Sequence, residues 1–85
     1  PPMPAQADAE ILDVRSYRCP MPVVLMEARL RGLPAGARLK VVADDPLAAV
    51  DIPHYCREGG HAAERLDGAA GTCVFLVTAG GNPRS

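Results

Sequence analysis

Two prolines separated by one residue determine where this chain changes from strand to helix. They belong to the segment Arg-Cys-Pro-Met-Pro at residues 18–22. Proline lacks a backbone N–H, so it suits the first turn of a helix and disrupts the interior of a helix or central strand. The apolar positions that follow recur with helical spacing: Val23, Met26, Leu30 and Leu33. The pattern predicts a strand over 10–14, a loop over 15–19 and a helix over 20–32.

Three further segments predict strands. Residues 38–44 alternate in polarity, as a half-buried strand does. Residues 61–67 carry a weaker strand pattern, and residues 72–78 carry the strongest one in the chain. The loop between these last two strands, residues 67–71, contains glycine and predicts an antiparallel hairpin.

The segment between the second and third strands is predominantly helical. Asp45 followed by Pro46 is typical of a helix start, because the carboxylate caps the first turn and proline suits the next position. Pro53 inside a continuous helix would remove a hydrogen bond and clash with a carbonyl. We therefore expect a short turn over 46–50 and a helix that restarts near Asp51.

This order of segments predicts an α/β (α+β) two-layer sandwich with the order β-α-β-α-β-β. A helix joins the first two strands, which favours a parallel pair, whereas the hairpin makes the last two antiparallel. The result is a mixed four-stranded sheet with two helices on one face. We expect a single domain over 10–79, a flexible N-terminal tail over 1–9 and a C-terminal tail over 80–85.

The composition narrows the classes of function. The formal net charge is -1, which provides no basic field for direct, stable nucleic-acid binding. No apolar run reaches the ~18–20 residues of a membrane span, so we expect no membrane association. Three cysteines without a CxxC pair argue against a disulfide scaffold and against a metal site. We expect reduced thiols, a cytoplasmic location and a monomer.

Cys19 is the residue with the clearest chemical potential. If the helix begins at Pro20, Cys19 is its N-cap, where the helix dipole favours a thiolate and lowers the thiol pKa. Pro20 and Pro22 stiffen this turn, and Arg18 adds a positive charge. A rigid, partly exposed thiol of low pKa suits a nucleophile. The alternative is an unreactive thiol, because cysteine is among the most buried residue types.

The topology predicts that charged residues lie near this thiol. The strands of a parallel β-α-β unit end at the same sheet edge, where ligand sites of open α/β sheets lie. Cys19 follows the first strand, and Asp44 and Asp45 follow the second, with Arg15 as a further contact. The aspartates position a partner or a proton, or Asp45 only caps the next helix. A carboxylate near the sulfur opposes thiolate formation, and Arg18 would offset it.

The remaining cysteines and histidines favour structural roles. Cys56 is expected to be a small buried apolar residue rather than a resolving thiol, and Cys73 is expected in the core. His54 and His61 have no ligand-spaced partner, so a solvated or capping role is favoured over metal binding.

Two separated motifs resemble the TusA (SirA-like) sulfur-carrier family. The first is Cys-Pro-x-Pro at the start of the first helix, here residues 19–22. The second is Asp-Pro, then Asp-Ile-Pro, then an aromatic-Cys pair, here residues 45–46, 51–53 and 55–56. The similarity extends over about residues 11–79, nearly the whole predicted domain.

The resemblance implies the same two-layer fold and a sulfurtransferase activity. It implies that Cys19 accepts sulfane sulfur as a transient persulfide, without another cofactor, from a cysteine desulfurase or a rhodanese-like donor. The sulfur then passes to an acceptor protein of the DsrE/TusD-like kind. The pathways that the resemblance suggests are tRNA 2-thiouridine synthesis, molybdenum-cofactor maturation and sulfur oxidation.

This chain also departs from the family pattern. Many members have glycine at the position of Ser16, and basic residues at the positions of Glu27 and Ala28. Two alternatives to the carrier also stay open. One is a noncatalytic regulatory or interaction module with the same fold. The other is a thiol–disulfide switch between Cys19 and Cys56, which requires Cα atoms within ~7 Å.

Overall fold

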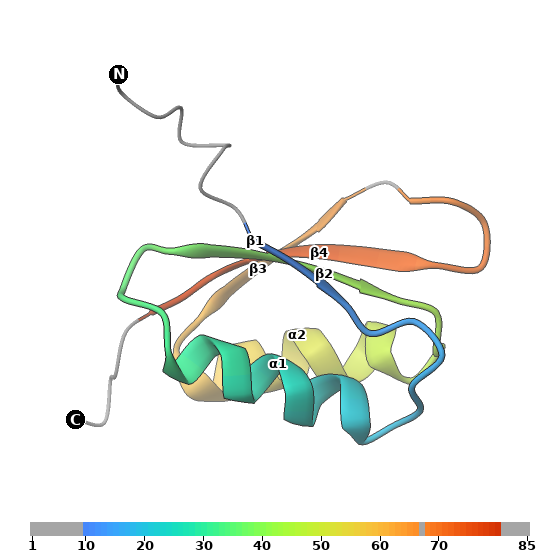
Figure 1. The fold of residues 1–85 in the computed structure, drawn as a ribbon, viewed down its shortest axis with the longest axis horizontal. Helices are drawn as coiled ribbons and strands as arrows, with labels where there is room; N and C mark the ends of the chain where they lie inside the picture. The colour runs from blue at the N-terminus through green and yellow to red at the C-terminus, as the bar shows by residue number, and fades with distance from the viewer. Residues whose placement is uncertain (1–9, 67, 81–85) are drawn as a thin grey trace.

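A computed structural model describes residues 10–66 and 68–80. The elements follow one another as β1 (Glu10–Asp13), α1 (Met21–Arg31), β2 (Arg38–Ala43), α2 (Ala48–Gly59), β3 (Ala62–Leu66) and β4 (Cys73–Thr78). Both helices lie on the same face of the sheet (Figure 1). The predicted two-layer α/β sandwich with the order β-α-β-α-β-β is confirmed.

The predicted tails lie largely outside the described residues. This holds for residues 1–9 and for residues 81–85. Gly80 is described, and its N–H donates to Nδ1 of His61 over 2.9 Å. Within the part of the chain that the structure describes, no helix has the length and apolar character that a membrane crossing requires.

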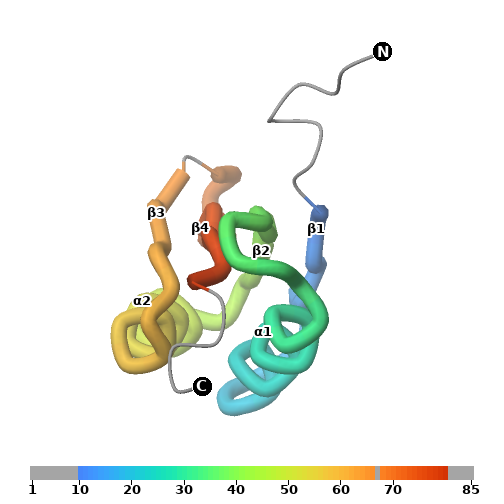
Figure 2. The backbone as a smooth tube through the Cα atoms, turned by 90° about the vertical axis from the view of Figure 1, so that its left-hand side faces the viewer, coloured from blue at the N-terminus to red at the C-terminus, as the bar shows by residue number. Residues whose placement is uncertain are grey.

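The four strands form one mixed sheet in the order β1-β2-β4-β3 (Figure 2). β1 and β2 are parallel, with Leu12 opposite Val41. β4 is antiparallel to both of its neighbours, with Phe75 opposite Val41 and Val77 opposite Ala63. α1 packs against β2, and α2 packs against β3 and β4. The carboxyl ends of β1 and β2 therefore share one edge of the sheet.

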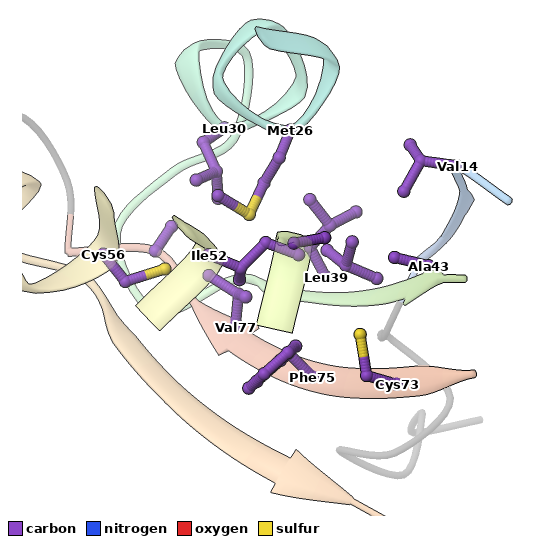
Figure 3. Packing of buried hydrophobic residues seen from close by; sticks show 13 residues of the cluster. Val14, Met26, Leu30, Leu39, Ala43, Ile52, Cys56, Cys73, Phe75 and Val77 are labelled. Atoms are coloured by element: carbon purple, nitrogen blue, oxygen red, sulfur yellow. The ribbon is translucent and has the colours of Figure 1, made fainter. Parts of the chain in front are cut away.

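The core lies between the sheet and the two helices (Figure 3). Alternate residues of the two central strands point into it: Leu39, Val41 and Ala43 from β2, and Cys73, Phe75 and Val77 from β4. The helices contribute Met26 and Leu30 from α1, and Ile52 and Cys56 from α2. The expectation that Cys56 and Cys73 are core residues is thus confirmed.

α1 begins one residue later than predicted. Pro20 is its N-cap, because the carbonyl of Pro20 accepts the N–H of Val24 over 3.1 Å. The N–H of Met21 is bonded to the carbonyl of Arg18 over 2.8 Å, which closes a turn before the helix. The prediction that Cys19 is the N-cap is wrong, since Cys19 precedes the cap.

α2 is continuous, so the predicted break before Asp51 is wrong. Pro53 lies inside the helix and removes only the hydrogen bond to the carbonyl of Ala49. One face of the helix is buried against the sheet through Ala48, Ile52 and Cys56. Burial of this continuous face outweighs the lost bond, because packing of an apolar face is the main stabilisation of a helix in a protein.

Truncation of Met26 tests this core. Its side chain is 0% exposed, so Met26→Ala should lower the free energy of unfolding by about 2–5 kcal/mol, measured by urea denaturation. Val24, on the same helix, is 46% exposed, and Val24→Ala should change the value by less than about 0.5 kcal/mol. If the two variants lost the same free energy of unfolding, the assignment of Met26 to the buried face of α1 would be contradicted.

Candidate thiol site

Two loops meet at the edge where β1 and β2 end. We call residues 15–20 the thiol loop and residues 44–47 the aspartate loop; Figure 1 shows both at the right-hand end of the sheet. The N–H of Ser16 donates to Oδ1 of Asp44 over 2.9 Å. The N–H of Cys19 donates to Oδ2 of Asp45 over 2.7 Å. The structure therefore brings together the residues that the parallel topology predicted to be neighbours.

Asp45 joins the two loops through its buried carboxylate. Its side chain is 5% exposed, and a carboxylate is costly to bury unless it is hydrogen-bonded. Oδ2 accepts the N–H of Cys19, and Oδ1 accepts the N–H of Leu47 over 3.2 Å. Asp45 thus closes the turn before α2 and also anchors the thiol loop. The N-cap of α2 is Leu47, without a side-chain cap bond, so the prediction that Asp45 caps this helix is wrong.

The two arginines of the thiol loop pair with aspartates. Arg15 donates to both carboxylate oxygens of Asp13, over 2.9 and 2.7 Å, and this lowers the pKa of Asp13 to about 2. Nη1 of Arg18 lies 3.5 Å from Oδ1 of Asp44. Arg18 precedes Cys19 in the chain, but its charge is directed at the aspartate loop. Arg15 is directed at β1.

The two prolines have different roles in the thiol loop. Pro20 is exposed at the cap, whereas Pro22 is fully buried in the second position of α1 and anchors the start of the helix in the core. Neither proline has a backbone N–H, and that of Met21 is bonded to Arg18. The first turn of α1 therefore has few donors left for the sulfur of Cys19.

Cys19 is exposed, and its nearest polar partner is a carboxylate. Its Sγ–H donates to Oδ2 of Asp51 across 2.9 Å. This hydrogen bond, followed by partial desolvation and by the charges of Asp51 and Asp45, raises the pKa of the Cys19 thiol. The prediction of a lowered pKa is wrong, because two carboxylates lie near the sulfur and the helix N-terminus has few free N–H groups.

Asp51 is the site residue that sequence reasoning missed. It lies in the first turn of α2, 32 residues from Cys19, and reaches the sulfur because α1 and α2 pack side by side. Its presence in the Asp-Ile-Pro motif was the available signal. From the position of Pro53, Asp51 was predicted to mark the start of a helix and nothing more.

The other candidates have structural positions. Burial raises the pKa of Cys56 to about 11, which opposes a role as a resolving thiolate. His61 stacks on Tyr55, with ring centroids 5.9 Å apart, and accepts the N–H of Gly80. His54 is exposed. Within residues 10–66 and 68–80, no three His, Cys, Asp or Glu side chains cluster as metal ligands.

Ser16 adopts a backbone conformation that favours glycine. Its φ is 78°, in the left-handed region, which serine rarely occupies. Its N–H bond to Asp44 holds it there. Glycine adopts this conformation without strain. This explains why glycine, which many chains of the family pattern described above have at this position, suits the loop.

The fold and the site define a class of protein: an open α/β sandwich that presents one exposed thiol beside a carboxylate at the edge of the sheet. This chain belongs to the TusA family, since the family model described as Sulfurtransferase TusA matches residues 10–79. The resemblance seen in the two motifs is thus confirmed.

Individual relatives agree with this assignment. A sulfur carrier protein TusA of Pseudomonas putida is 39% identical over 67 residues, which are 79% of this chain and 84% of the relative. One of Pseudomonas syringae is 40% identical over 70 residues, 82% of each chain. The crystal structure of a SirA-like protein from Desulfitobacterium hafniense matches with a TM-score of 0.74 at 24% identity. This match covers 82% of this chain and 96% of that one, and it supports the fold.

Removal of the Asp51 charge should change the ionisation of Cys19. In Asp51→Asn the thiolate no longer faces the nearer of its two carboxylates, so the pKa of Cys19 should fall and the alkylation–pH curve should shift to lower pH. The measurement is the rate of iodoacetamide alkylation of the Cys19 peptide, followed by mass spectrometry across a pH series. Glu58→Gln, an exposed position on the same helix, should leave the curve in place. An unshifted curve in Asp51→Asn would contradict the assigned hydrogen bond.

The left-handed conformation of Ser16 makes a separate prediction about stability. Ser16→Val should lower the free energy of unfolding by about 1–3 kcal/mol, because a β-branched residue is strained at this φ. Ser16→Gly should match or exceed the wild type, and Ser16→Ala should lie close to it. Chemical denaturation measures all three. A valine variant as stable as the glycine variant would contradict the left-handed assignment.

Proposed function

We propose that this chain is a sulfur carrier that takes up sulfane sulfur as a persulfide on Cys19 and passes it to a thiol of a partner protein. The observation that carries the proposal is the exposed Cys19 thiol within the Cys-Pro-Met-Pro motif of a TusA-family chain. The relatives of Pseudomonas putida and Pseudomonas syringae bear the name sulfur carrier protein TusA, which supports the same role here.

The transfer consists of two exchange steps that need no external oxidant. In uptake, the Cys19 thiolate attacks the outer sulfur of a donor persulfide, the donor S–S bond breaks, and the donor thiolate leaves. In delivery, an acceptor thiolate attacks the outer sulfur on Cys19, the S–S bond on Cys19 breaks, and the Cys19 thiolate is regenerated. Both steps require an accessible sulfur, which the exposed thiol loop provides.

The surroundings of the thiol support partners that are proteins. Large exposed apolar side chains lie in the thiol loop and near the starts of both helices: Tyr17, Met21, Leu47 and Val50. A protein partner that docks at this edge of the sheet would bury them. We propose a cysteine desulfurase or rhodanese-like donor and a DsrE/TusD-like acceptor, which act in the cytoplasm, where thiols stay reduced. The relay serves tRNA 2-thiouridine synthesis, molybdenum-cofactor maturation or sulfur oxidation.

Sulfur loading tests the proposal directly. The wild-type protein, incubated with cysteine and a cysteine desulfurase, should gain the mass of one sulfur atom (~32 Da) in intact-mass spectrometry, and dithiothreitol should remove it. Cys19→Ser should gain nothing. The double variant Cys56→Ala/Cys73→Ala should still load, because both replaced thiols are buried.

Two results would contradict the carrier role. One is a wild-type protein that stays unmodified with the desulfurase and also with thiosulfate and a rhodanese. The other is equal loading of the wild type and Cys19→Ser. Absence of loading would favour the noncatalytic interaction module.

A further inference from the structure

Asp51 directs a carboxylate at the reacting sulfur from a different element of the fold. Its Oδ2 lies 2.9 Å from Sγ of Cys19, within hydrogen-bonding distance. α2 fixes the backbone of Asp51, and Asp51 is half-buried, so its carboxylate is held at the edge where the thiol loop lies. Asp45 already closes the turn before α2, which leaves the carboxylate of Asp51 available to the thiol.

We infer that Asp51 is the proton-exchanging catalytic residue of sulfur transfer at Cys19. The inference rests on the proposed function and adds to it a base for uptake and an acid for the leaving thiolate. A general base must lie within hydrogen-bonding reach of the proton that it removes, and Asp51 meets this geometric requirement.

The proton and electron balance of uptake is as follows. The Asp51 carboxylate takes the proton of the Cys19 thiol, and the resulting thiolate attacks the outer sulfur of the donor persulfide. The S–S bond of the donor breaks, its electron pair goes to the inner sulfur, and the protonated Asp51 gives its proton to that thiolate. The products are the Cys19 persulfide, the donor thiol and the ionised Asp51. Delivery runs through the same transfers in reverse order.

The other charged groups around the sulfur are not placed for this role. Both oxygens of Asp45 accept backbone N–H groups. Asp44 accepts the N–H of Ser16 and lies beside Arg18, which is directed at it. His54, in the next turn of α2, is exposed, and among the described residues the thiol of Cys19 is hydrogen-bonded to Asp51 and not to His54. The raised pKa of Cys19 keeps the free thiol protonated at neutral pH, so a base has a proton to remove.

Two reactions of Cys19 distinguish a role of Asp51 in proton exchange from a role in which its charge only disfavours the thiolate. Iodoacetamide alkylation reports the thiolate, because the departing iodide needs no proton. Uptake from glutathione persulfide releases a thiolate that benefits from a proton. In Asp51→Asn, alkylation at neutral pH should become faster, whereas uptake should become slower by about tenfold or more. Asp51→Glu should retain more of the uptake rate, and Glu58→Gln should change neither rate.

The outcomes distinguish this role from the carrier function itself. Opposite changes in the two rates of Asp51→Asn, with a wild-type circular dichroism spectrum, support proton exchange. Two rates that rise together show that Asp51 only suppresses the thiolate, and two that fall together show a structural role; either result overturns the inference while sulfur loading stands. A wild-type protein that takes up no sulfur overturns the proposed function and this inference with it. If Asp51→Asn does not fold, the uptake and alkylation rates of Asp51→Glu are compared with those of the wild type. A displaced carboxylate should lower the ratio of uptake to alkylation, and an unchanged ratio would overturn the inference.

Discussion

The parallel pairing of β1 with β2 is the constraint on which the thiol site depends. It places the carboxyl ends of the two strands at one edge, so that the thiol loop and the aspartate loop leave the sheet side by side. Asp45 then joins the loops through one buried carboxylate, whose oxygens accept the N–H groups of Cys19 and Leu47. A buried charge is stable only when such bonds satisfy it. The position of the thiol loop is thus coupled to the start of α2.

The site combines an exposed sulfur with a polar neighbourhood that keeps it protonated. The thiol of Cys19 is held by the carboxylate of Asp51, and the first turn of α1 is poor in free N–H groups because of its prolines. In the proposed function, the thiol stays protonated in the free protein and loses its proton only during transfer with a partner.

Much of the fold was predictable because the sequence patterns are local. The alternation along β2 and β4 reflects one buried face of the sheet, and Met26 and Leu30 lie one turn apart on the buried face of α1. The break expected at Pro53 was wrong, because local propensity omits the burial of Ile52 and Cys56 against the sheet. The N-cap of α1 is one residue later than predicted, again because contacts outside the local pattern decide it. The turn closed by Arg18 and the burial of Pro22 determine where that helix begins.

The sequence by itself determined the order of elements and the family, because these follow from periodicity, from proline chemistry and from two motifs in register. It also determined that Cys19 and the two aspartates of the aspartate loop meet at one edge, since that follows from a parallel β-α-β unit. Only the tertiary structure decided which group lies beside the thiol. The carboxylate whose hydrogen bond raises the pKa of Cys19 comes from α2, 32 residues away, through the packing of two helices that no local pattern encodes.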